Sequence, residues 1–251
     1  MLTKQRQQLI LQRLSVAGLI VAKELSAELD TSEDTIRRDL RELASQGLLV
    51  RVHGGALPRA LAGSALPERA TLSLAAKAAM AKKALAFIHD GQTIFLDGGT
   101  TTLELARQMR PDMRITVITH SVTVGAELVN NPSIELILLG GKIFKHSGVA
   151  VGSMVVEAIA AIKADVFFLG ATGVHFQSGV TTGDMEESHI KRALMLAAGE
   201  TILMVSPEKI NAVSAFKIAE LGEISTLIVN EALPANLRQA LKKNNVQVSQ
   251  A

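Results

Sequence analysis

One stretch decides the fold at the start of this chain: Ser32-Glu-Asp-Thr-Ile-Arg-Arg-Asp-Leu-Arg-Glu-Leu-Ala-Ser-Gln-Gly-Leu-Leu-Val-Arg-Val-His-Gly-Gly-Ala56. Its first half carries an apolar stripe at helical spacing, formed by Ile36, Leu40 and Leu43. Gly47 ends the predicted helix. A strand-like run at 48–51 and a turn at 53–55 follow. The stretch therefore predicts a helix, a strand and a glycine-tipped turn, in that order.

Two shorter helical patterns precede this stretch. Residues 3–16 and 21–29 each place apolar side chains on one face. The turn between the second pattern and the third helix supplies an N-cap: Thr31 with Asp34 resembles a capping box, and Ser32 is the competing cap. Three helices followed by a strand and a basic turn are the parts of a winged helix-turn-helix.

The polar side chains of the third helix suit a nucleic acid. Arginine offers bidentate hydrogen bonds to guanine in the major groove, and hydroxyls at a helix N-terminus suit phosphate oxygens. The glycine-tipped turn can approach the DNA backbone closely, as a wing does. The predicted DNA-binding residues are Ser32, Thr35, Arg37, Arg38, Arg41, Arg51, His53 and Gly54. The alternative is a solvated helix face with charge pairs such as Asp34–Arg38 and Arg38–Glu42.

At these residues the chain resembles the DeoR family of bacterial transcriptional regulators. The family pattern stands here as Ser32, Thr35-Ile36-Arg37-Arg38-Asp39-Leu40, Leu43, Gly47 and Arg51-Val52-His53-Gly54-Gly55-Ala56. The resemblance implies a winged helix-turn-helix DNA-binding domain at 3–58. Within it, the helix-turn-helix spans about residues 20–39.

The composition limits the classes of protein to consider. Of the 251 residues, 48% are hydrophobic and 20% charged, which is enough apolar material for a buried core. The formal net charge is +2, and residues 1–60 hold nine Lys or Arg against seven Asp or Glu. Cysteine is absent, and neither a signal segment nor a long apolar run is present. We therefore expect a cytoplasmic protein without a membrane span.

Beyond residue 73, short apolar strands alternate with helices. Residues 59–73 are rich in small residues and contain Gly63 and Pro67, which indicates a linker. Strands are predicted at 93–96, 115–119, 134–139, 166–169, 202–205 and 227–229. Helices are predicted at 75–88, 102–109, 122–129, 152–162, 185–198 and 234–243. The alternation predicts an α/β domain at 74–235 with a parallel sheet covered on both faces, and a C-terminal helix and strand to 251.

Polar and glycine residues follow four of the predicted strands. Residues 97–102, Asp-Gly-Gly-Thr-Thr-Thr, lie between a strand and a helix, where glycines and threonine hydroxyls can hold a phosphate. A plain strand–helix turn with threonine caps is the alternative. The loops at 119–121, 140–142 and 170–173 follow neighbouring strands. Ligands of open α/β sheets bind at the carboxyl ends of strands, so these loops predict a ligand site there.

The resemblance to the DeoR family extends over about residues 75–235. The family's sensor is similar to the sugar-phosphate isomerase and CoA-transferase fold and commonly binds a phosphorylated sugar or a related metabolite. The loops and the resemblance together give the expected effector-binding residues: Asp97, Gly98, Gly99, Thr100, Thr101, Thr119, His120, Ser121, Gly140, Gly141, Lys142, Thr172, Gly173, Glu186, Lys191 and Lys209.

Two positions depart from the family. His120 stands where the family has Asn, and Ser206-Pro207-Glu208 stands where it has Asp-Ser-Ser before the final Lys209. We therefore expect a ligand that differs from the commoner sugar phosphates. His120 either donates to a ligand oxygen and titrates at mildly acidic pH, or is a simple hydrogen-bonded loop histidine. Glu186 and Glu187 are adjacent on a helix and point about 100° apart, so one of them faces inward.

The leading hypothesis is a transcriptional regulator of a carbohydrate or sugar-acid utilisation operon. Repression is the family default, with release from operator DNA by a phosphorylated sugar or related metabolite. One small helix-turn-helix makes few base contacts, so a homodimer or homotetramer is expected.

Other classes of function fit less well. A sugar-phosphate isomerase or transferase with an N-terminal fusion is the alternative, but no acid–base pair is fixed by spacing and no catalytic residue is assigned. An RNA-binding or scaffold protein is disfavoured because only 3% of residues are aromatic. The six histidines show no metal-ligand spacing, so neither a metal nor a cofactor is expected.

Overall fold

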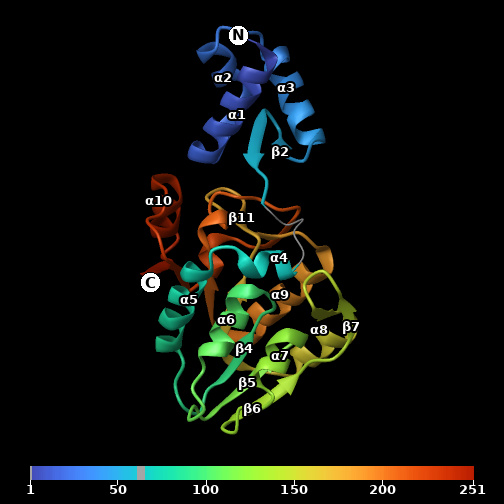
Figure 1. Ribbon diagram of the computed structural model, residues 1–251, viewed down its shortest axis with the longest axis vertical. Coiled ribbons are helices and arrows are strands. Elements are labelled where there is room, and N and C mark those ends of the chain that lie inside the picture. The colour runs from blue at the N-terminus through green and yellow to red at the C-terminus, as the bar shows by residue number, and fades with distance from the viewer. Residues whose placement is uncertain (1, 61–65) are drawn as a thin grey trace.

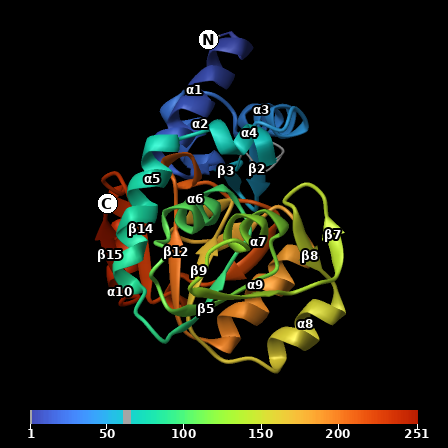
Figure 2. The same ribbon diagram turned by 60° about the horizontal axis from the view of Figure 1, so that its bottom comes forward.

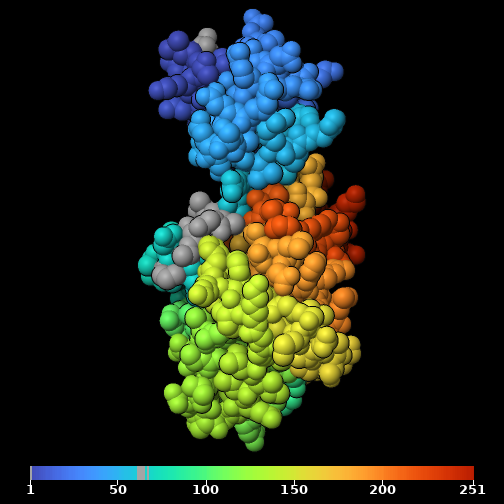
Figure 3. Space-filling view, turned by 90° about the vertical axis from the view of Figure 1, so that its right-hand side faces the viewer, coloured from blue at the N-terminus to red at the C-terminus, as the bar shows by residue number. Residues whose placement is uncertain are grey.

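The computed structural model describes residues 2–60 and 66–251. Figure 1 shows two units along the long axis, a small N-terminal unit and a larger α/β unit below it. The space-filling view in Figure 3 shows a narrow waist between them. The two-part architecture that the sequence predicts is confirmed.

The N-terminal unit packs three helices against a small sheet. Its helices are α1 (Thr3–Ala17), α2 (Ala22–Glu28) and α3 (Glu33–Ser45). Its strands are β1 (Ile20–Val21), β2 (Leu49–Val52) and β3 (Gly55–Pro58), which form an antiparallel sheet in the order β1-β3-β2. The predicted stripe of Ile36, Leu40 and Leu43 is buried against Ile10 and Leu14 of α1. Helix packing therefore fixes which face of α3 points outward.

Two local predictions at the start of this unit are settled by the structure. Ser32 rather than Thr31 caps α3, because its Oγ accepts the Thr35 N–H at 3.2 Å. The predicted helix at 21–29 was placed too early: Ile20 and Val21 form β1, and Val21 pairs with Gly55. These β-branched residues complete the sheet of the wing, which outweighs their weaker preference for a helix.

The larger unit is built on one parallel sheet. Its seven strands lie in the order β15-β14-β12-β9-β4-β5-β6. Their bounds are β4 (Thr93–Leu96), β5 (Ile115–Thr119), β6 (Ile134–Leu138), β9 (Ala164–Gly170), β12 (Ala198–Met204), β14 (Thr226–Val229) and β15 (Gln247–Gln250). The predicted doubly covered parallel sheet is confirmed.

Helices cover both faces of this sheet. The helices are α5 (Leu74–Ala84), α6 (Thr100–Gln108), α7 (Val122–Leu128), α8 (Ser153–Ala160), α9 (Met185–Ala197) and α10 (Ala235–Lys243). Alternate strand residues enter opposite cores: Phe95 packs with residues of α8, α9 and α10, while Ile94 and Leu96 pack with residues of α5, α6 and α7. Figure 2 shows α6 and α7 in front of the strands.

Short strands that the sequence did not predict lie around this sheet. β7 (Lys142–Phe144) and β8 (Val149–Val151) form a hairpin. β10 (Gly173–His175), β11 (Gly179–Thr182) and β13 (Phe216–Ala219) form an antiparallel sheet, which lies on the side of the N-terminal unit in Figure 1. Runs of three or four residues are too short to show a period, so only their tertiary pairing defines them.

The stretch expected as a linker at 59–73 is partly ordered. Residues 61–65 of that expectation lie outside the described residues. Leu66–Thr71 form a short helix, α4, because Leu, Glu, Arg and Ala are good helix formers. Arg59 forms a bridge with Val213 of the larger unit. Within residues 2–60 and 66–251, no helix combines the length and apolar character needed to cross a bilayer.

Candidate DNA-binding face and effector site

The outer face of α3 carries the residues expected to bind DNA. Arg37, Arg38 and Arg41 are exposed, as is Ser32 at the start of the helix, and Thr35 is half-buried. Only Arg37 of the three arginines has an acidic partner among the described residues, Glu33 at 2.7 Å. The charge pairs that a merely solvated face would use, Asp34–Arg38 and Arg38–Glu42, are not formed. Two cations on this face are therefore left for an anionic partner.

The wing is held against the rest of the N-terminal unit. Arg51, His53 and Gly54 are exposed at its tip, and the Gly54 carbonyl accepts the N–H of Ala22 at 2.8 Å. A Cβ on Gly55 would lie 1.9 Å from the Ile20 carbonyl oxygen, so only glycine permits this approach. The predicted wing residues thus lie at an exposed, anchored tip.

Asp39 has a role that the sequence did not predict. It lies inside the family pattern, yet it is fully buried and forms an ion pair with the buried guanidinium of Arg6 on α1. The hydrogen bond to Asp39 raises the pKa of Arg6 above its usual value, although burial opposes this. Asp39 therefore fixes α3 to α1 and does not face DNA. The sequence offered one signal of this burial: Asp39 directly precedes Leu40 of the apolar stripe.

At the carboxyl ends of the strands of the larger unit, Asp97 organises a buried polar cluster. Its carboxylate accepts the N–H groups of Gly98 and Gly170, each at 2.8 Å, and forms an ion pair with Lys191 of α9. Lys191 also donates to the Gly170 carbonyl at 3.1 Å. His120 Nε2 lies 3.7 Å from Asp97. The structure therefore brings together Asp97, His120 and Lys191, three of the residues expected to bind the effector.

His120 is held neutral near pH 7. Burial lowers its pKa to about 4, nearby Lys191 adds to this, and Asp97 opposes it. Its Nδ1 is buried and has no hydrogen-bond partner among residues 2–60 and 66–251. Titration at mildly acidic pH, one of the two expectations from the sequence, does not fit this burial. A neutral imidazole with a free ring nitrogen can instead bond a ligand hydroxyl or water.

Beside this cluster, three cations line one cleft. Arg69 of α4, Lys77 of α5 and Lys209 lie around it with Thr100, Thr172 and Glu208. Burial lowers the pKa of Lys209 to about 8; Glu208 opposes this, and the charges of Lys77, Arg69 and Lys191 add to it. Burial also lowers the pKa values of Arg69 and Lys77. An anion placed among these partly dehydrated cations would offset their mutual repulsion.

Glu208 supplies the carboxylate that the sequence lacks at 206. Burial would raise its pKa, but hydrogen bonds from Ser206 at 2.5 Å and Ser73 at 2.8 Å leave the pKa below its usual value. It is therefore ionised beside Lys209. A carboxylate two residues after position 206 thus lies beside Lys209.

A second hollow of about 220 Å³ adjoins the cleft and shares Arg69 and Thr172 with it. Its wall includes Ser147, Asp184 and Glu187. Glu187 is buried and Thr182 donates to it at 3.5 Å, whereas Glu186 is exposed and lines a different hollow on the outside of α9. The inward member of the acidic pair is Glu187, so Glu186, which the sequence analysis named, lies away from the cleft.

The other predicted effector residues fall into two groups. Near the cluster, Thr119 donates to the Leu96 carbonyl at 2.7 Å and Ser121 caps α7. A Cβ on Gly98 would lie 2.2 Å from a methyl of Val149, and Thr101 Oγ1 is buried without a partner in the described chain. Gly99 is the N-cap residue of α6, and Gly173 lies in β10. The exposed group, Gly140, Gly141 and Lys142, lines neither the cleft nor the adjoining hollow.

Arg69 and Lys77 were missed by sequence reasoning. Arg69 lay in the stretch taken as a linker, and Lys77 in a helix taken as a covering element. One signal was present: Lys77 falls three and four residues before Met80 and Ala81, on the buried stripe of α5. A cation on an apolar stripe needs a partner. Among the described residues, no group of three or more His, Asp or Glu could hold a metal ion.

An exposed basic helix with a wing, joined to an α/β unit with an enclosed cationic cleft, defines a DNA-binding protein with a ligand-sensing domain. The DeoR-like helix-turn-helix domain family matches residues 6–58, and the DeoR C terminal sensor domain family matches residues 73–231. The chain belongs to the DeoR family and is a DNA-binding transcriptional regulator. The family and the named relatives are regulators, so the enzyme alternative is not supported.

Two curated relatives agree with this assignment over 94% or more of this chain. The lactose phosphotransferase system repressor of Lactococcus lactis subsp. lactis is 36% identical over 94% of this chain and 94% of its own. The HTH-type transcriptional regulator GlpR of Haloferax volcanii is 32% identical over 99% and 98%. Ribose 5-phosphate isomerase A of Methanocaldococcus jannaschii superposes with a TM-score of 0.39 at 18% identity, over 53% of each chain.

Proposed function

We propose that this regulator represses a sugar or sugar-acid utilisation operon and leaves its operator when a phosphorylated ligand enters the cleft between Arg69, Lys77 and Lys209. The convergence of these three cations on one cleft is the observation that supports the proposal. Its lining has a single carboxylate, Glu208, among the described residues. A phosphate dianion would offset the remaining positive charge and accept hydrogen bonds from all three.

The groups around the cleft suit the rest of such a ligand. Thr100 and Thr172 offer hydroxyls, and Glu187 in the adjoining hollow can accept hydrogen bonds from ligand hydroxyls. His120 offers a ring nitrogen that has no hydrogen-bond partner among residues 2–60 and 66–251. Polar groups that remain buried without partners in the free protein favour a ligand that satisfies them. The name of the Lactococcus relative, which refers to a sugar phosphotransferase system, supports the same ligand class.

DNA binding is proposed to use α3 and the wing. Arg38 and Arg41 have no acidic partner among the described residues and would contact phosphates or base edges, with Arg51 and His53 at the wing. One such unit reads a short half-site, so the functional species is proposed to be a homodimer or homotetramer on repeated half-sites. The ligand must bind the DNA-free arrangement better than the DNA-bound one, or it shifts nothing.

Thermal unfolding with paired sugars tests the ligand proposal. Each phosphorylated sugar or sugar acid is compared with its unphosphorylated form. A ligand at a hundredfold excess over its Kd stabilises the folded protein by about 2.7 kcal/mol. We expect stabilisation by phosphorylated members only, and its loss in Lys209→Met, which keeps the length of the side chain.

Lys142→Met is the matched control, because Lys142 is exposed and lies outside the cleft. It should keep the full stabilisation. Equal stabilisation by the unphosphorylated sugars, or a full response in Lys209→Met, would contradict the proposal.

A further inference from the structure

One segment of the larger unit touches both the cationic cleft and the N-terminal unit. Residues 206–214, here called the bridging segment, follow β12 and lead to β13. Its first residues supply Glu208 and Lys209 to the cleft. Asn211 and Val213, two and four residues after Lys209, contact the N-terminal unit. Lys209 ends a short 3-10 turn at Pro207–Lys209, and only Ile210 separates it from Asn211, so a shift at Lys209 reaches Asn211.

The first contact with the N-terminal unit is a backbone ladder. The N–H of Val213 donates to the Pro58 carbonyl at 2.9 Å, and the N–H of Ala60 donates to the Val213 carbonyl at 3.0 Å. Pro58 is the last residue of β3, the central strand of the N-terminal sheet and one of the two strands of the wing. The wing therefore runs directly into hydrogen bonds with the bridging segment.

The second contact is made by the side chain of Asn211. Asn211 has a φ of 57° and is only 3% exposed. Gly18, which ends α1 with a φ of 72°, lies against it: a Cβ on Gly18 would be 2.9 Å from Asn211 Cγ. The Gly18 carbonyl accepts a hydrogen bond from His175 Nε2 at 2.8 Å. The end of α1 is thus seated between the bridging segment and β10.

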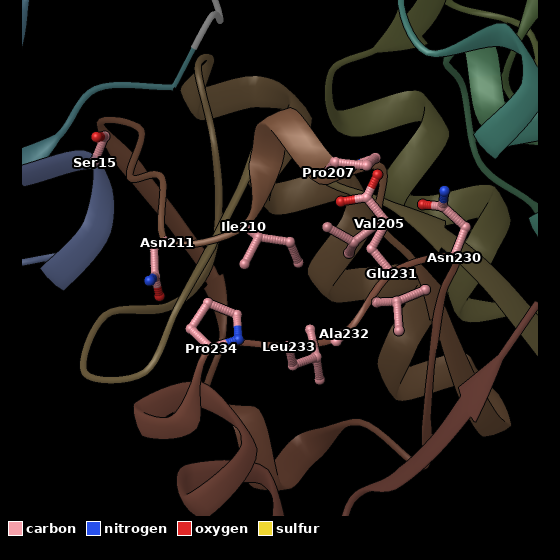
Figure 4. Close-up of a pocket in the computed structure, with 11 residues that line it drawn as sticks. Ser15, Val205, Pro207, Ile210, Asn211, Asn230, Glu231, Ala232, Leu233 and Pro234 are labelled. Atoms are coloured by element: carbon pink, nitrogen blue, oxygen red, sulfur yellow. The ribbon is translucent and has the colours of Figure 1, made fainter. Parts of the chain in front are cut away.

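A hollow of about 220 Å³ lies beside this contact (Figure 4). Its wall includes Ser15 of α1, Ile210 and Asn211 of the bridging segment, and Asn230 and Pro234 of the loop before α10. The side-chain oxygens of Asn211 and Asn230 are buried and lack hydrogen-bond partners in the described part of the chain. The bridging segment thus has space beside it, and the side-chain oxygen of Asn211 has no hydrogen bond among the described residues to hold it in place.

We propose that Asn211 is a positioning residue through which the cleft sets the orientation of the DNA-binding unit. When an anion draws in Lys209, the bridging segment moves, and Asn211 and the ladder at Val213 move α1 and the wing with it. The half-sites of an operator have a fixed spacing, so a changed orientation lowers operator affinity without any contact between ligand and DNA. This inference rests on the proposed anion site at Lys209.

The test measures ligand binding and domain orientation separately. The chain has no cysteine, so Gln46→Cys in the N-terminal unit and Lys82→Cys on α5 give two unique positions for a fluorescent donor and acceptor. Both residues are exposed. Labelled chains are diluted into excess unlabelled protein, so that energy transfer reports distances within one chain. Inorganic phosphate is the probe, with chloride at equal ionic strength as the blank, and thermal unfolding reports its binding.

Asn211→Gly is the informative variant, because glycine keeps the positive φ and removes the side chain that meets Gly18. We expect phosphate to change energy transfer in the parent protein. In Asn211→Gly the binding midpoint should stay within twofold while the change in energy transfer falls by at least half. Asn230 lines the same hollow from another segment, and the Asn230→Ala variant should keep the full change in energy transfer. If Asn211→Gly unfolds, Asn211→Ala, which also removes the side-chain atoms beyond Cβ, serves in its place.

The outcomes separate the two proposals. If phosphate binds the parent protein but leaves energy transfer unchanged, or Asn211→Gly keeps the full change, the positioning role is wrong and the anion site stands. If phosphate fails to stabilise the parent protein, the anion site is wrong, and the positioning role falls with it.

Discussion

The two units hold their cations in opposite ways. The arginines of α3 are exposed to solvent, and Arg37 forms its ion pair with Glu33 at the surface. In the cleft, Arg69, Lys77 and Lys209 are partly dehydrated and their pKa values are lowered. DNA is too large to be enclosed, so its phosphates must come to exposed charges and displace counterions. A small anion can be enclosed by the protein, where the lower dielectric constant strengthens each charge–charge interaction.

The largest expected effect comes from the two ion pairs of α3, one of which is buried and one exposed. Asp39→Ala leaves the buried Arg6 without its partner, which costs about 3–5 kcal/mol of unfolding free energy. Chemical denaturation measures this. Glu33→Ala removes the exposed partner of Arg37 on the same helix and should cost about 0.5 kcal/mol or less. Equal losses for the two variants would show that burial of the Arg6–Asp39 pair is unimportant.

The second effect concerns pH and the cluster around Asp97. The pKa of His120 is about 4 in the folded protein and near 6.5 when unfolded, so the unfolded chain binds a proton first as the pH falls. This contribution is intact above pH 6.5 and declines by about 3 kcal/mol as the pH falls to 4. Denaturation at several pH values measures it. In His120→Asn this decline should be absent, and an unchanged profile would contradict the assignment.

A smaller effect is expected on DNA. Arg38→Ala removes one exposed cation from α3, so operator affinity should fall about tenfold and the slope of log Kobs against log salt by about one, if Arg38 contacts a phosphate. Titrations of a promoter fragment at several salt concentrations measure both. Lys145→Ala removes an exposed cation from the larger unit and should change neither. A salt slope equal to that of the parent protein would exclude a phosphate contact at Arg38.

The smallest expected effect is a difference in pH dependence between anion binding in the cleft and DNA binding by the exposed arginines. Lys209 loses its proton above pH 8, whereas arginines keep theirs, so phosphate affinity should fall by up to tenfold per pH unit between 8 and 9 while DNA affinity stays level. Calorimetric titration of phosphate gives the profile. A flat phosphate profile in this range would mean that Lys209 does not hold the anion.

The sequence predicts the parts of this molecule whose evidence is local. The stripe of Ile36, Leu40 and Leu43 and the apolar run at Thr93–Leu96 carry their periods within a few residues, and both form the predicted elements. β10, β11 and β13 are only three or four residues long and are defined by their pairing with one another, so their sequences show no period. The boundary at Ile20–Val21 was missed for the same reason.

The site divides in the same way. Asp97 and Lys209 lie in recognisable patterns after buried strands, but Arg69 reaches the cleft from a helix in what resembles a linker. Glu186 and Glu187 are chemically identical neighbours, and only the rotation of α9 decides which faces inward. Position in the sequence identifies which loops meet, while side-chain direction depends on packing.

The joint between the wing and Val213 has a consequence for hybrid regulators. Its hydrogen bonds join backbone atoms, so the DNA-binding unit of another family member could be grafted at Pro58 and still form the ladder. The contact of Asn211 with Gly18 depends on side chains, and any larger residue at 18 would meet it. A hybrid that lacks glycine there is expected to fold and bind DNA but to respond poorly to its ligand, unless residues 206–214 are exchanged with the graft.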